Sequence, residues 1–466
     1  MSDTALPFLP TAPSYKLSPT APALFGDRSA EWTSYSALAA RVLELQAYFP
    51  LQTKDLIFCA APRTVEGVTA YLAAAASGHA VGMIDVSTLH LRAAIDVYRP
   101  GTIIAPAGQS LPGYKTVQSP LITLEILRRE VADRTAIHKD LYLLLLTSGS
   151  TGSPKGVRLS YQNIASNTAA IAASLGLTPE GRALVHLPLS YSYGLSVLHM
   201  QLASGGSCLL TEQGMMSRTF WQLAQAERAT VFSGVPYHYE MLAKLGLDRI
   251  QADSFRMFTQ AGGAMSPELT LDVWRGIEAR QGQLFIMYGQ TEASPRISCL
   301  AFHDHPAKLG SCGRVLQGGE ISIEDEEVVY TGPNVMMGYA ESRSDLALGD
   351  VLHRRLATGD LGYLDDDHYL FITGRRQRFA KLYGFRISLD DIETLAGRHG
   401  PSAALEIRGM IVVVTTIRDE AMHERIRKSI LEATGLSSAW LEIRWLEGIP
   451  LEPNGKVAYG RLREGL

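Results

Sequence analysis

The chain has 466 residues, of which 46% are hydrophobic and 19% are charged, and its formal net charge is -4. The length allows two or three domains, and the composition is typical of a globular protein with a large core. Because no long run of one charge sign occurs, a nucleic-acid-binding surface is not expected.

The first predicted elements follow a Pro-rich segment, residues 1–25, which is expected to wrap the surface. Residues 65–77 predict a helix and residues 80–84 a strand. The stretch 67–84 is long and apolar, so it resembles a membrane span in hydropathy alone. Its centre, Ala-Ser-Gly-His at 76–79, instead favours a turn between a buried helix and a buried strand. No membrane span is therefore expected.

Further apolar strands continue this alternation of helix and strand. They are predicted at residues 102–105, 141–146, 183–188, 207–211, 230–233, 257–260 and 284–288. Helices that alternate with strands are typical of parallel sheets covered on both faces.

After residue 310 the pattern changes to short alternating strands. Strands are predicted at 320–324, 327–331, 410–415 and 441–445, a hairpin with an acidic turn at 363–370, and a helix at 420–434. The last ninety or so residues therefore predict a small α+β domain.

The loop that follows the strand at 141–146 is rich in Thr, Ser and Gly, with Lys155 near its far end. Gly allows close approach of the backbone, N–H groups and hydroxyls donate hydrogen bonds, and Lys adds a positive charge, so such a loop suits phosphate. It is not a Walker A loop, because Lys155 follows Pro154 and precedes Gly156. The alternative interpretation is a polar turn between this strand and a helix that starts near Tyr161.

Four later segments accompany this loop along the chain. They are Met-Tyr-Gly-Gln-Thr-Glu-Ala at 287–293, Ala-Thr-Gly-Asp-Leu-Gly-Tyr at 357–363, Gly-Arg at 374–375 with Gly-Phe-Arg-Ile at 384–387, and Pro-Asn-Gly-Lys at 453–456. In this order, the loop and the segments resemble the signature motifs of the adenylate-forming superfamily. That superfamily includes acyl- and aryl-CoA synthetases, fatty-acyl-AMP ligases, peptide-synthetase adenylation domains and luciferases.

The resemblance implies an α/β fold with a large N-terminal domain and a mobile α+β C-terminal lid. The large domain would contain two parallel-type α/β subdomains and a small β-barrel-like subdomain. The expected boundaries are 1–374 for the AMP-binding domain, 375–378 for a hinge and 379–466 for the lid. Gln377 occupies the hinge place, where many relatives carry Asp or Lys.

The resemblance also implies a two-step reaction that needs ATP and Mg²⁺. A carboxylate attacks the α-phosphorus of ATP to give an acyl-adenylate and pyrophosphate, and a thiol then displaces AMP. The site must neutralise the triphosphate charge and hold the carboxylate in line.

Specific residues take on roles through this resemblance. The predicted contacts to ATP and AMP are Thr147, Ser148, Gly149, Ser150, Thr151, Gly152, Lys155, Gly262, Gly263, Ala264, Tyr288, Gly289, Thr291, Asp360, Arg375 and Lys456. Among them, Thr291 would bind the α-phosphate, Tyr288 would stack on adenine and Asp360 would accept hydrogen bonds from the ribose hydroxyls. Glu292 would ligate Mg²⁺, since hard cations choose carboxylate oxygen.

The expected catalytic residues are Lys456, Thr291 and Glu292. By composition alone Lys456 is an ordinary lysine near the C-terminus, and its Pro-Asn-Gly-Lys context makes it the candidate that bridges the carboxylate and the α-phosphate. The resemblance implies that the lid then swings, withdraws this lysine and presents the face near Gly384 for thiol transfer.

The acid pocket is less specific in sequence. Its expected wall residues are Tyr191, Val235, Tyr237, His238, Gly262 and Tyr288. Amino-acid-activating relatives carry an Asp in the segment 187–195, and this chain has none there, so a buried ammonium would lack its partner. An acyl or aryl acid is therefore expected rather than an α-amino acid.

The thiol acceptor stays open between CoA and the phosphopantetheine of a separate carrier protein. The segment 379–388 departs from the Ser-Gly-Gly-Glu-Asn pattern of many CoA ligases, which modestly favours a carrier. A stand-alone amino-acid adenylation enzyme and a non-catalytic nucleotide-binding relative are the alternatives. The latter would be expected to lose Lys456, Glu292 or Asp360, and all three are present.

The four cysteines lie far apart and form no Cys-x-x-Cys pair, which fits a reduced compartment. The N-terminus lacks a basic region followed by an apolar core, so no signal peptide is expected. A cytoplasmic location follows as an expectation.

Overall fold

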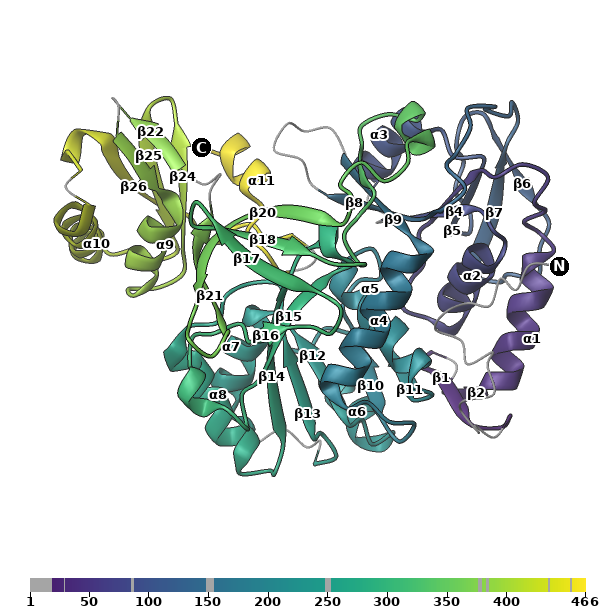
Figure 1. The fold of residues 1–466 in the computed structure, drawn as a ribbon, viewed down its shortest axis with the longest axis horizontal. Helices are drawn as coiled ribbons and strands as arrows, with labels where there is room; N and C mark the ends of the chain where they lie inside the picture. The colour runs from purple at the N-terminus through teal and green to yellow at the C-terminus, as the bar shows by residue number, and fades with distance from the viewer. Residues whose placement is uncertain are drawn as a thin grey trace. The chain divides into compact units, whose positions relative to one another are not determined.

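The computed structural model describes residues 19–28, 30–84, 88–147, 155–247, 253–375, 379–382, 385–434, 436–452 and 455–466. These residues form two compact units (Figure 1). The N-terminal unit takes its described residues from Met1–Ile321 and Tyr330–Leu356, and the C-terminal unit from Ser322–Val329 and Ala357–Leu466. Residues 376–378 of the expected hinge lie outside the described residues, so the boundary at 375–378 stays a prediction.

An eight-stranded mixed sheet forms one layer of the N-terminal unit, in the order β19-β9-β8-β4-β3-β5-β7-β6. Its strands are β3 Leu56–Cys59, β4 Ala80–Met83, β5 Thr102–Pro106, β6 Tyr114–Val117, β7 Leu124–Arg129, β8 Leu141–Thr147, β9 Lys155–Ser160 and β19 Gly338–Ala340. The central strands β5, β3, β4 and β8 are parallel, and the flanking strands are antiparallel. Strands β3 and β4 are buried along their whole length, which explains why they are continuous apolar runs without alternation.

Helix α1 Tyr35–Gln46 precedes β3, helix α2 Val65–Ala76 connects β3 to β4, and helix α3 Thr88–Tyr98 connects β4 to β5. Helix α2 begins where the Thr64 hydroxyl accepts a hydrogen bond from the Gly67 N–H, and it is buried from Gly67 to Ala76. The apolar stretch 67–84 is thus a buried helix followed by a buried strand, as the sequence predicted. Within the described part of the chain, no helix combines the length and apolar character needed to cross a bilayer.

A nine-stranded mixed sheet forms the other large layer, in the order β16-β15-β14-β13-β12-β10-β11-β1-β2. Its strands are β1 Pro22–Gly26, β2 Glu31–Ser34, β10 Arg182–Val185, β11 Ser207–Leu210, β12 Val231–Gly234, β13 Met257–Gln260, β14 Gln283–Gly289, β15 Arg296–Ala301 and β16 Arg314–Val315. The associated helices are α4 Tyr161–Leu175, α5 Ser192–Ala203, α6 Arg218–Ala226, α7 Pro236–Leu245 and α8 Pro267–Glu278.

The parallel strands of this sheet bring their carboxyl ends to one edge. Strands β10, β12, β13 and β14 are parallel neighbours. Ligands of open α/β sheets bind outside the carboxyl ends of such strands. The candidate residues that follow β12, β13 and β14 therefore gather at this edge.

A smaller sheet has the order β17-β18-β20-β21. Its strands are β17 Glu320–Glu324, β18 Glu327–Thr331, β20 Arg355–Leu364 and β21 Leu370–Arg375. This sheet stands where the barrel-like subdomain was expected, and β17 and β21 form its two edges, so no closure into a barrel is seen among the described strands.

The rest of the C-terminal unit has the predicted α+β character. Its elements are β22 Phe379–Leu382, β23 Phe385–Ser388, β24 Ser402–Ile407, β25 Met410–Thr415, β26 Leu441–Trp445, α9 Leu389–Gly397, α10 Glu420–Thr434 and α11 Tyr459–Glu464. Ile426 and Ile430 of α10 are fully buried with Ile411 and Val413 of β25 in its core.

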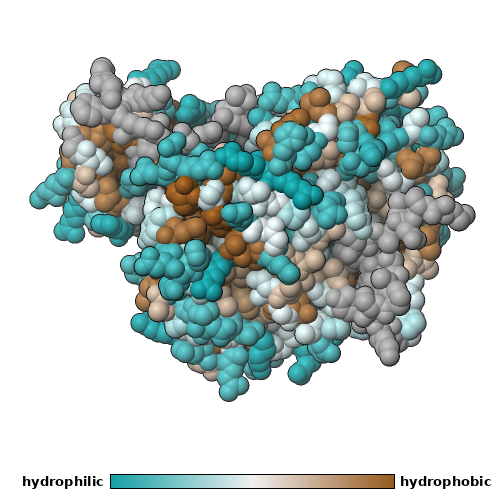
Figure 2. Space-filling model, in the orientation of Figure 1, coloured by the Kyte–Doolittle hydropathy of each residue, from teal (hydrophilic) through white to brown (hydrophobic). Residues whose placement is uncertain are grey.

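On the face shown in Figure 2, hydrophilic residues predominate and hydrophobic residues form separate patches.

The structure corrects the sequence analysis in two respects. The phosphate-type loop does not lead directly into the helix at Tyr161, because the strand β9 intervenes and pairs antiparallel with β8. The large sheets are mixed rather than purely parallel, since β7, β9 and β15 run antiparallel to their neighbours. Alternating short patterns do not reveal strand direction, so the sequence could not distinguish these cases.

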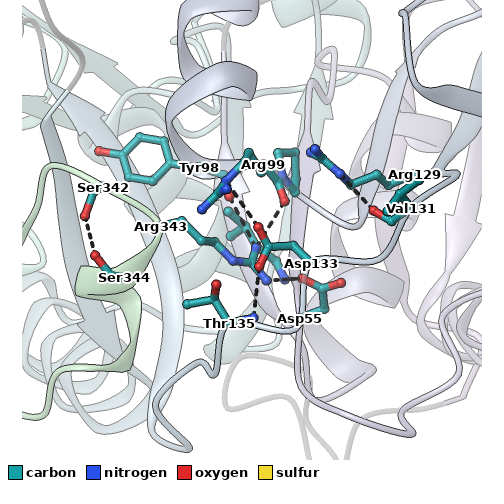
Figure 3. A network of polar contacts seen from close by, with 12 residues as sticks. Asp55, Tyr98, Arg99, Arg129, Val131, Asp133, Thr135, Ser342, Arg343 and Ser344 are labelled. Carbon is teal, nitrogen blue, oxygen red and sulfur yellow. Dashed lines mark hydrogen bonds and ion pairs between the residues drawn. The ribbon is translucent and has the colours of Figure 1, made fainter.

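Two buried arginines tie the eight-stranded sheet to the segment after β19. Arg343 Nη2 donates to Asp55 Oδ1 at 2.7 Å, and Arg343 Nη1 lies 3.3 Å from the carbonyl oxygens of Tyr98 and Arg99 (Figure 3). Arg158 of β9 donates to four carbonyl oxygens, those of Met337, Tyr339, Leu348 and Gly349. The fold supplies acceptors for both buried cations, and only the Nε of Arg343 is left without one.

Candidate active site

The turn that carries Thr291 and Glu292 follows β14 and forms the short 3-10 helix η2, Thr291–Ala293. A Cβ on Gly289 would lie 1.8 Å from the Pro295 carbonyl oxygen, so only glycine allows the chain to fold back here. The Thr291 and Ser192 hydroxyl oxygens are 3.0 Å apart. This contact joins the turn to the first residue of α5.

Glu292 is held at two points. Its Oε1 accepts a hydrogen bond from the Tyr339 hydroxyl at 2.7 Å, and its carbonyl oxygen accepts one from the Met336 N–H at 2.9 Å. Burial and the neighbouring Glu292 raise the pKa of Tyr339, so the phenol stays protonated and donates. The carboxylate therefore has a fixed orientation.

Magnesium fits this arrangement when phosphate oxygens complete its shell. Glu292 is half-buried and offers hard oxygen ligands. The described residues contain no group of three or more His, Cys, Asp or Glu that could hold a metal ion. A cation here would depend on one carboxylate and on substrate oxygens, which is how Mg²⁺ commonly binds beside nucleotides.

Lys155 belongs to the same cluster. Its Nζ lies 3.1 Å from Glu341 Oε1 and 4.0 Å from the centroid of the Tyr339 ring. Tyr339 thus contacts both Lys155 at the end of the phosphate-type loop and Glu292. In the pairing of β8 with β9, Thr147 lies opposite Lys155, so the two ends of that loop are adjacent.

Three predicted pocket residues also lie together. Gly262 has a φ of 87°, and a Cβ there would lie 2.4 Å from the Tyr191 hydroxyl oxygen and 3.2 Å from Val235 Cγ1. A side chain at 262 would therefore displace Tyr191, which explains the glycine.

His238 lies beside Val235 on the first turn of α7. Its Nδ1 accepts a hydrogen bond from the Val235 N–H at 3.1 Å. Burial lowers the pKa of His238 to about 4, so the imidazole is neutral near pH 7. Tyr237 packs edge-on against His238 and is exposed, so it contributes less to an enclosed wall.

The segment after β13 leaves its backbone accessible. The Gly263 carbonyl oxygen accepts a hydrogen bond from Gln260 Nε2 at 2.8 Å, while Gly263 and Ala264 are exposed. Tyr288 is half-buried against a small apolar cluster that includes Ala293 and Ile297. These residues lie at the carboxyl edge of the sheet, and their contacts to nucleotide stay a prediction.

In the C-terminal unit, Asp360 is only 3% exposed. Its Oδ1 lies 2.9 Å from Arg375 Nε, and the two residues are opposite each other in β20 and β21. The preceding Gly359 N–H donates to Glu327 Oε1 at 2.8 Å. Asp360 and Arg375, predicted separately from two motifs, are thus direct partners.

Lys456 lies exposed in the turn before α11. Its carbonyl oxygen accepts a hydrogen bond from the Glu452 N–H at 2.7 Å, and Leu451 pairs with Val457 across the turn. The pairing holds the backbone of Lys456 without burying its side chain.

Some predicted residues cannot be placed. Ser148, Gly149, Ser150, Thr151 and Gly152 lie outside the described residues, as does the side chain of Thr147. The same holds for Gln377, Gly384, Pro453 and Asn454.

A family model described as AMP-binding enzyme matches residues 14–340, which is more than half of the chain. The chain belongs to this AMP-binding enzyme family. The motif-based prediction of an AMP-forming, adenylate-forming enzyme is thereby confirmed at the level of the family.

Curated relatives of this AMP-binding enzyme include CoA ligases. It is 29% identical over 366 residues to 4-coumarate-CoA ligase 1 of Narcissus pseudonarcissus, covering 72% of this chain and 66% of that ligase. It is 28% identical over 347 residues to a 2-succinylbenzoate–CoA ligase of Bacillus velezensis, covering 70% of this chain and 69% of that ligase. The matched region thus spans about two thirds of the length of these relatives.

The fold has a close counterpart among solved structures. The o-succinylbenzoate CoA synthetase of Bacillus subtilis, solved with its acyl-adenylate intermediate, aligns with a TM-score of 0.76 over 96% of both chains at 22% identity. At this identity the likeness establishes the α/β fold of the AMP-binding enzyme.

A separate cavity of about 530 Å³ lies between the eight-stranded sheet and α4 and is lined by Lys54, His79, Tyr142, Tyr161 and Arg354 among others. No residue predicted to contact nucleotide or acid lines it. This cavity is therefore separate from the candidate active site.

Sequence reasoning missed two positioning residues, Tyr339 and Ser192. Tyr339 lies on the short strand β19, far in sequence from both Lys155 and Glu292, and no local pattern marks it. Ser192 falls inside the segment identified with the acid pocket, but its partnership with Thr291 depends on tertiary structure.

Proposed function

We propose that this chain is an ATP-dependent acid–thiol ligase that makes an acyl-adenylate and transfers the acyl group to CoA. The observation that carries the proposal is the cluster in which Tyr339 contacts both Lys155 and Glu292, and Thr291 is anchored by Ser192. It brings residues from two separate motifs together beside the carboxyl edge of the nine-stranded sheet. Membership of the AMP-binding enzyme family supports the same chemistry.

In the first half-reaction, a carboxylate oxygen of the acid forms a bond to the α-phosphorus of ATP. The bond from that phosphorus to the bridging oxygen breaks, and pyrophosphate leaves with the electron pair. No general base is required, because the nucleophile is already a carboxylate. The protein's contribution is alignment and stabilisation of the negative charge.

Different described residues would align the reactants and stabilise the negative charge. Lys155 would bind the outer phosphates, the Thr291 hydroxyl would donate to the α-phosphate, and Glu292 would hold Mg²⁺, which neutralises phosphate charge when bound. Asp360, oriented by Arg375, would accept hydrogen bonds from the ribose hydroxyls. Lys456, whose side chain is exposed, would bridge the carboxylate and the α-phosphate.

In the second half-reaction, the thiol sulfur attacks the acyl carbon, the carbon–oxygen bond to AMP breaks and the thiol proton leaves. The names of the relatives, both CoA ligases, support CoA as the acceptor. The segment 379–388, which favoured a carrier protein in the sequence, has few described side chains, so it adds no structural support for that preference.

The acid is proposed to be an acyl or aryl acid rather than an α-amino acid. His238 is neutral near pH 7, and the described pocket residues include no carboxylate that would pair with an ammonium group. The relatives' names, coumarate and succinylbenzoate ligases, support an aryl acid as the first class to test.

The test is thioester formation by the full chain with ATP, Mg²⁺, an acid panel and either CoA or a phosphopantetheinylated carrier protein. Mass spectrometry would detect the acyl-CoA. Acyl-CoA formed together with AMP supports the proposal. Acyl-adenylate that is consumed only when the carrier is present would contradict CoA as acceptor while retaining the adenylation step.

A further inference from the structure

Arg296 occupies an unusual position at the start of β15, four residues after Glu292. It is 3% exposed. Its backbone is fixed by Asn167, whose Oδ1 accepts from the Arg296 N–H at 3.1 Å and whose Nδ2 donates to the Arg296 carbonyl oxygen at 2.8 Å. Asn334 Nδ2 donates to the same carbonyl oxygen at 3.0 Å. The N–H and carbonyl groups of Arg296 thus have hydrogen-bond partners, which fix the position from which its side chain extends.

The guanidinium group of Arg296, by contrast, has no hydrogen-bond acceptor among the described residues. Its Cζ lies 4.1 Å from the centroid of the Tyr193 ring, a cation–π contact. Its Nε is buried without a hydrogen-bond partner, and none of the described residues forms an ion pair with this group. A buried cation without an anion is strongly disfavoured, so the site is incomplete as a purely structural element.

The group lies beside the predicted acid pocket. The Tyr193 and Tyr191 rings pack edge-to-face with centroids 6.2 Å apart, and the Arg296 charge acts on both phenols. The Tyr191 hydroxyl in turn lies against Gly262. The Tyr193 hydroxyl donates a hydrogen bond to the Thr259 carbonyl oxygen at 2.8 Å. The side of the guanidinium toward Tyr191 and Gly262 is therefore the one that faces the predicted acid pocket.

We propose that Arg296 binds a second anionic group of the acid substrate, remote from the carboxylate that is adenylated, and that the substrate is a dicarboxylic acid. This inference rests on the proposed function. A carboxylate matches the planar fork of a guanidinium and would supply the missing acceptor. The reacting carboxylate must instead reach the α-phosphate beside Thr291. A positive charge at this depth also disfavours an α-amino acid, because its ammonium would meet a like charge.

The test compares matched acids that differ only in the second carboxylate, namely benzoate with terephthalate and hexanoate with adipate. The wild type is compared with Arg296→Met, which removes the charge at similar length, and Arg296→Lys, which retains it. Arg182→Met is the matched control, because Arg182 also stacks on an aromatic ring, with Cζ 4.5 Å from the Trp32 centroid, but lies at the start of β10.

In acid-dependent ATP–pyrophosphate exchange, the wild type should prefer the dicarboxylate of at least one pair by about tenfold or more in kcat/KM. Arg296→Met should lose or reverse that preference, Arg296→Lys should keep part of it, and Arg182→Met should keep all of it. Equal losses for both members of each pair in Arg296→Met, or a wild-type preference for the monocarboxylates, would overturn the proposal.

Thermal melting provides a readout that does not need turnover. The same dicarboxylate should raise the melting temperature of the wild type and not that of Arg296→Met, and unliganded Arg296→Met should melt above the wild type because an uncompensated charge is gone. Absence of exchange together with this selective stabilisation would reject the ligase function and retain the anion site. Equal stabilisation of the wild type and Arg296→Met would reject the site itself.

Discussion

Buried arginines in the two large sheets of the N-terminal unit differ in the hydrogen-bond acceptors that surround them. At the eight-stranded sheet, Arg158 has four carbonyl acceptors, and Arg343 has the Asp55 carboxylate and two carbonyls. At the nine-stranded sheet, the Arg296 guanidinium stacks on the Tyr193 ring and has no hydrogen-bond acceptor among the described residues, whereas Arg343 lacks a partner only at its Nε. All three are nearly inaccessible, so exposure does not explain the difference.

The comparison distinguishes buried arginines that stabilise the fold, Arg158 and Arg343, from Arg296, which is proposed to bind a ligand. A satisfied buried cation makes the structure specific, and removing it leaves acceptors unpaired. An unsatisfied cation destabilises the unliganded protein and is understandable if a ligand completes it. The two cases predict opposite effects of mutation on stability, and the following experiments use that contrast.

The largest effect is expected where a charge serves chemistry without being buried. Lys456→Ala should reduce acid-dependent pyrophosphate exchange by about a hundredfold or more, on the scale of losing a transition-state donor. Melting should be unchanged, because the side chain is exposed. Thiol transfer from a supplied acyl-adenylate should be largely spared.

Lys428→Ala on α10 is the matched control for Lys456→Ala, since Lys428 is also exposed. It should retain full exchange. If Lys456→Ala lost both half-reactions equally, the model in which the lid presents different faces in the two steps would be wrong.

Removing a buried arginine that has a carboxylate and two carbonyl acceptors should have the next largest effect. Arg343→Met should lower the free energy of unfolding by about 2–3 kcal/mol, somewhat less than for a fully buried pair because Asp55 is partly exposed. Chemical denaturation would measure the loss. Exchange activity at a permissive temperature should be unchanged, and the double variant Arg343→Met with Asp55→Asn should be less destabilised than the sum of the single variants. An Arg343→Met protein as stable as the wild type would remove the basis of the contrast between the sheets.

Protonating the buried His199 would place a positive charge in the core, as at Arg296. No substrate anion is proposed to neutralise the charge of His199. Burial lowers the pKa of His199 to about 3, and its Nε2 lies 2.8 Å from the Tyr71 hydroxyl. Since the folded pKa lies below the unfolded value of about 6.5, the unfolded state binds more protons at acidic pH, and stability falls as pH decreases. Between pH 7 and pH 5 this group alone should remove about 2 kcal/mol.

Denaturation curves at pH 7 and pH 5 would measure that loss, with His199→Gln as the comparison. The amide of Gln can still pair with Tyr71 but does not titrate, so the variant should lose less stability on acidification. An identical pH dependence in both proteins would argue against a neutral His199.

The smallest effect concerns Tyr339, which orients Glu292. Tyr339→Phe keeps the ring under Lys155 but removes the hydrogen bond to Oε1. A loss of about 1 kcal/mol, or roughly fivefold in kcat/KM for MgATP, is expected for one such bond. Tyr363→Phe, at an exposed tyrosine, should have no effect. An unaffected Tyr339→Phe enzyme would mean that Glu292 does not depend on this contact.

Much of the fold could be predicted because its strands are short apolar runs with clear boundaries. The strands at 257–260, 320–324 and 410–415 have the predicted bounds, and the helix at 420–434 does too. Strand β9 was missed because Lys155–Ser160 mixes Lys, Gly and Arg, and its Arg158 is buried only through carbonyls supplied by distant segments.

In the candidate site, too, some residues could be predicted from sequence patterns and others depend on tertiary contacts. Motifs indicated Thr291, Glu292, Asp360 and Arg375 as candidates, because the residues of each motif are close together in sequence. Tyr339 and Arg296 were not identified, since the importance of each depends on contacts made through tertiary structure. Burial without a partner is a property of the fold, which sequence patterns do not report.

The most direct test of the central claim is acid-dependent ATP–pyrophosphate exchange by the full chain with Mg²⁺, across aryl, fatty, hydroxy, dicarboxylic and amino acids. Exchange supported by a class of non-amino acid is the predicted result. Exchange with α-amino acids alone would contradict the proposed pocket chemistry, and exchange with none of these acids would contradict the adenylation function.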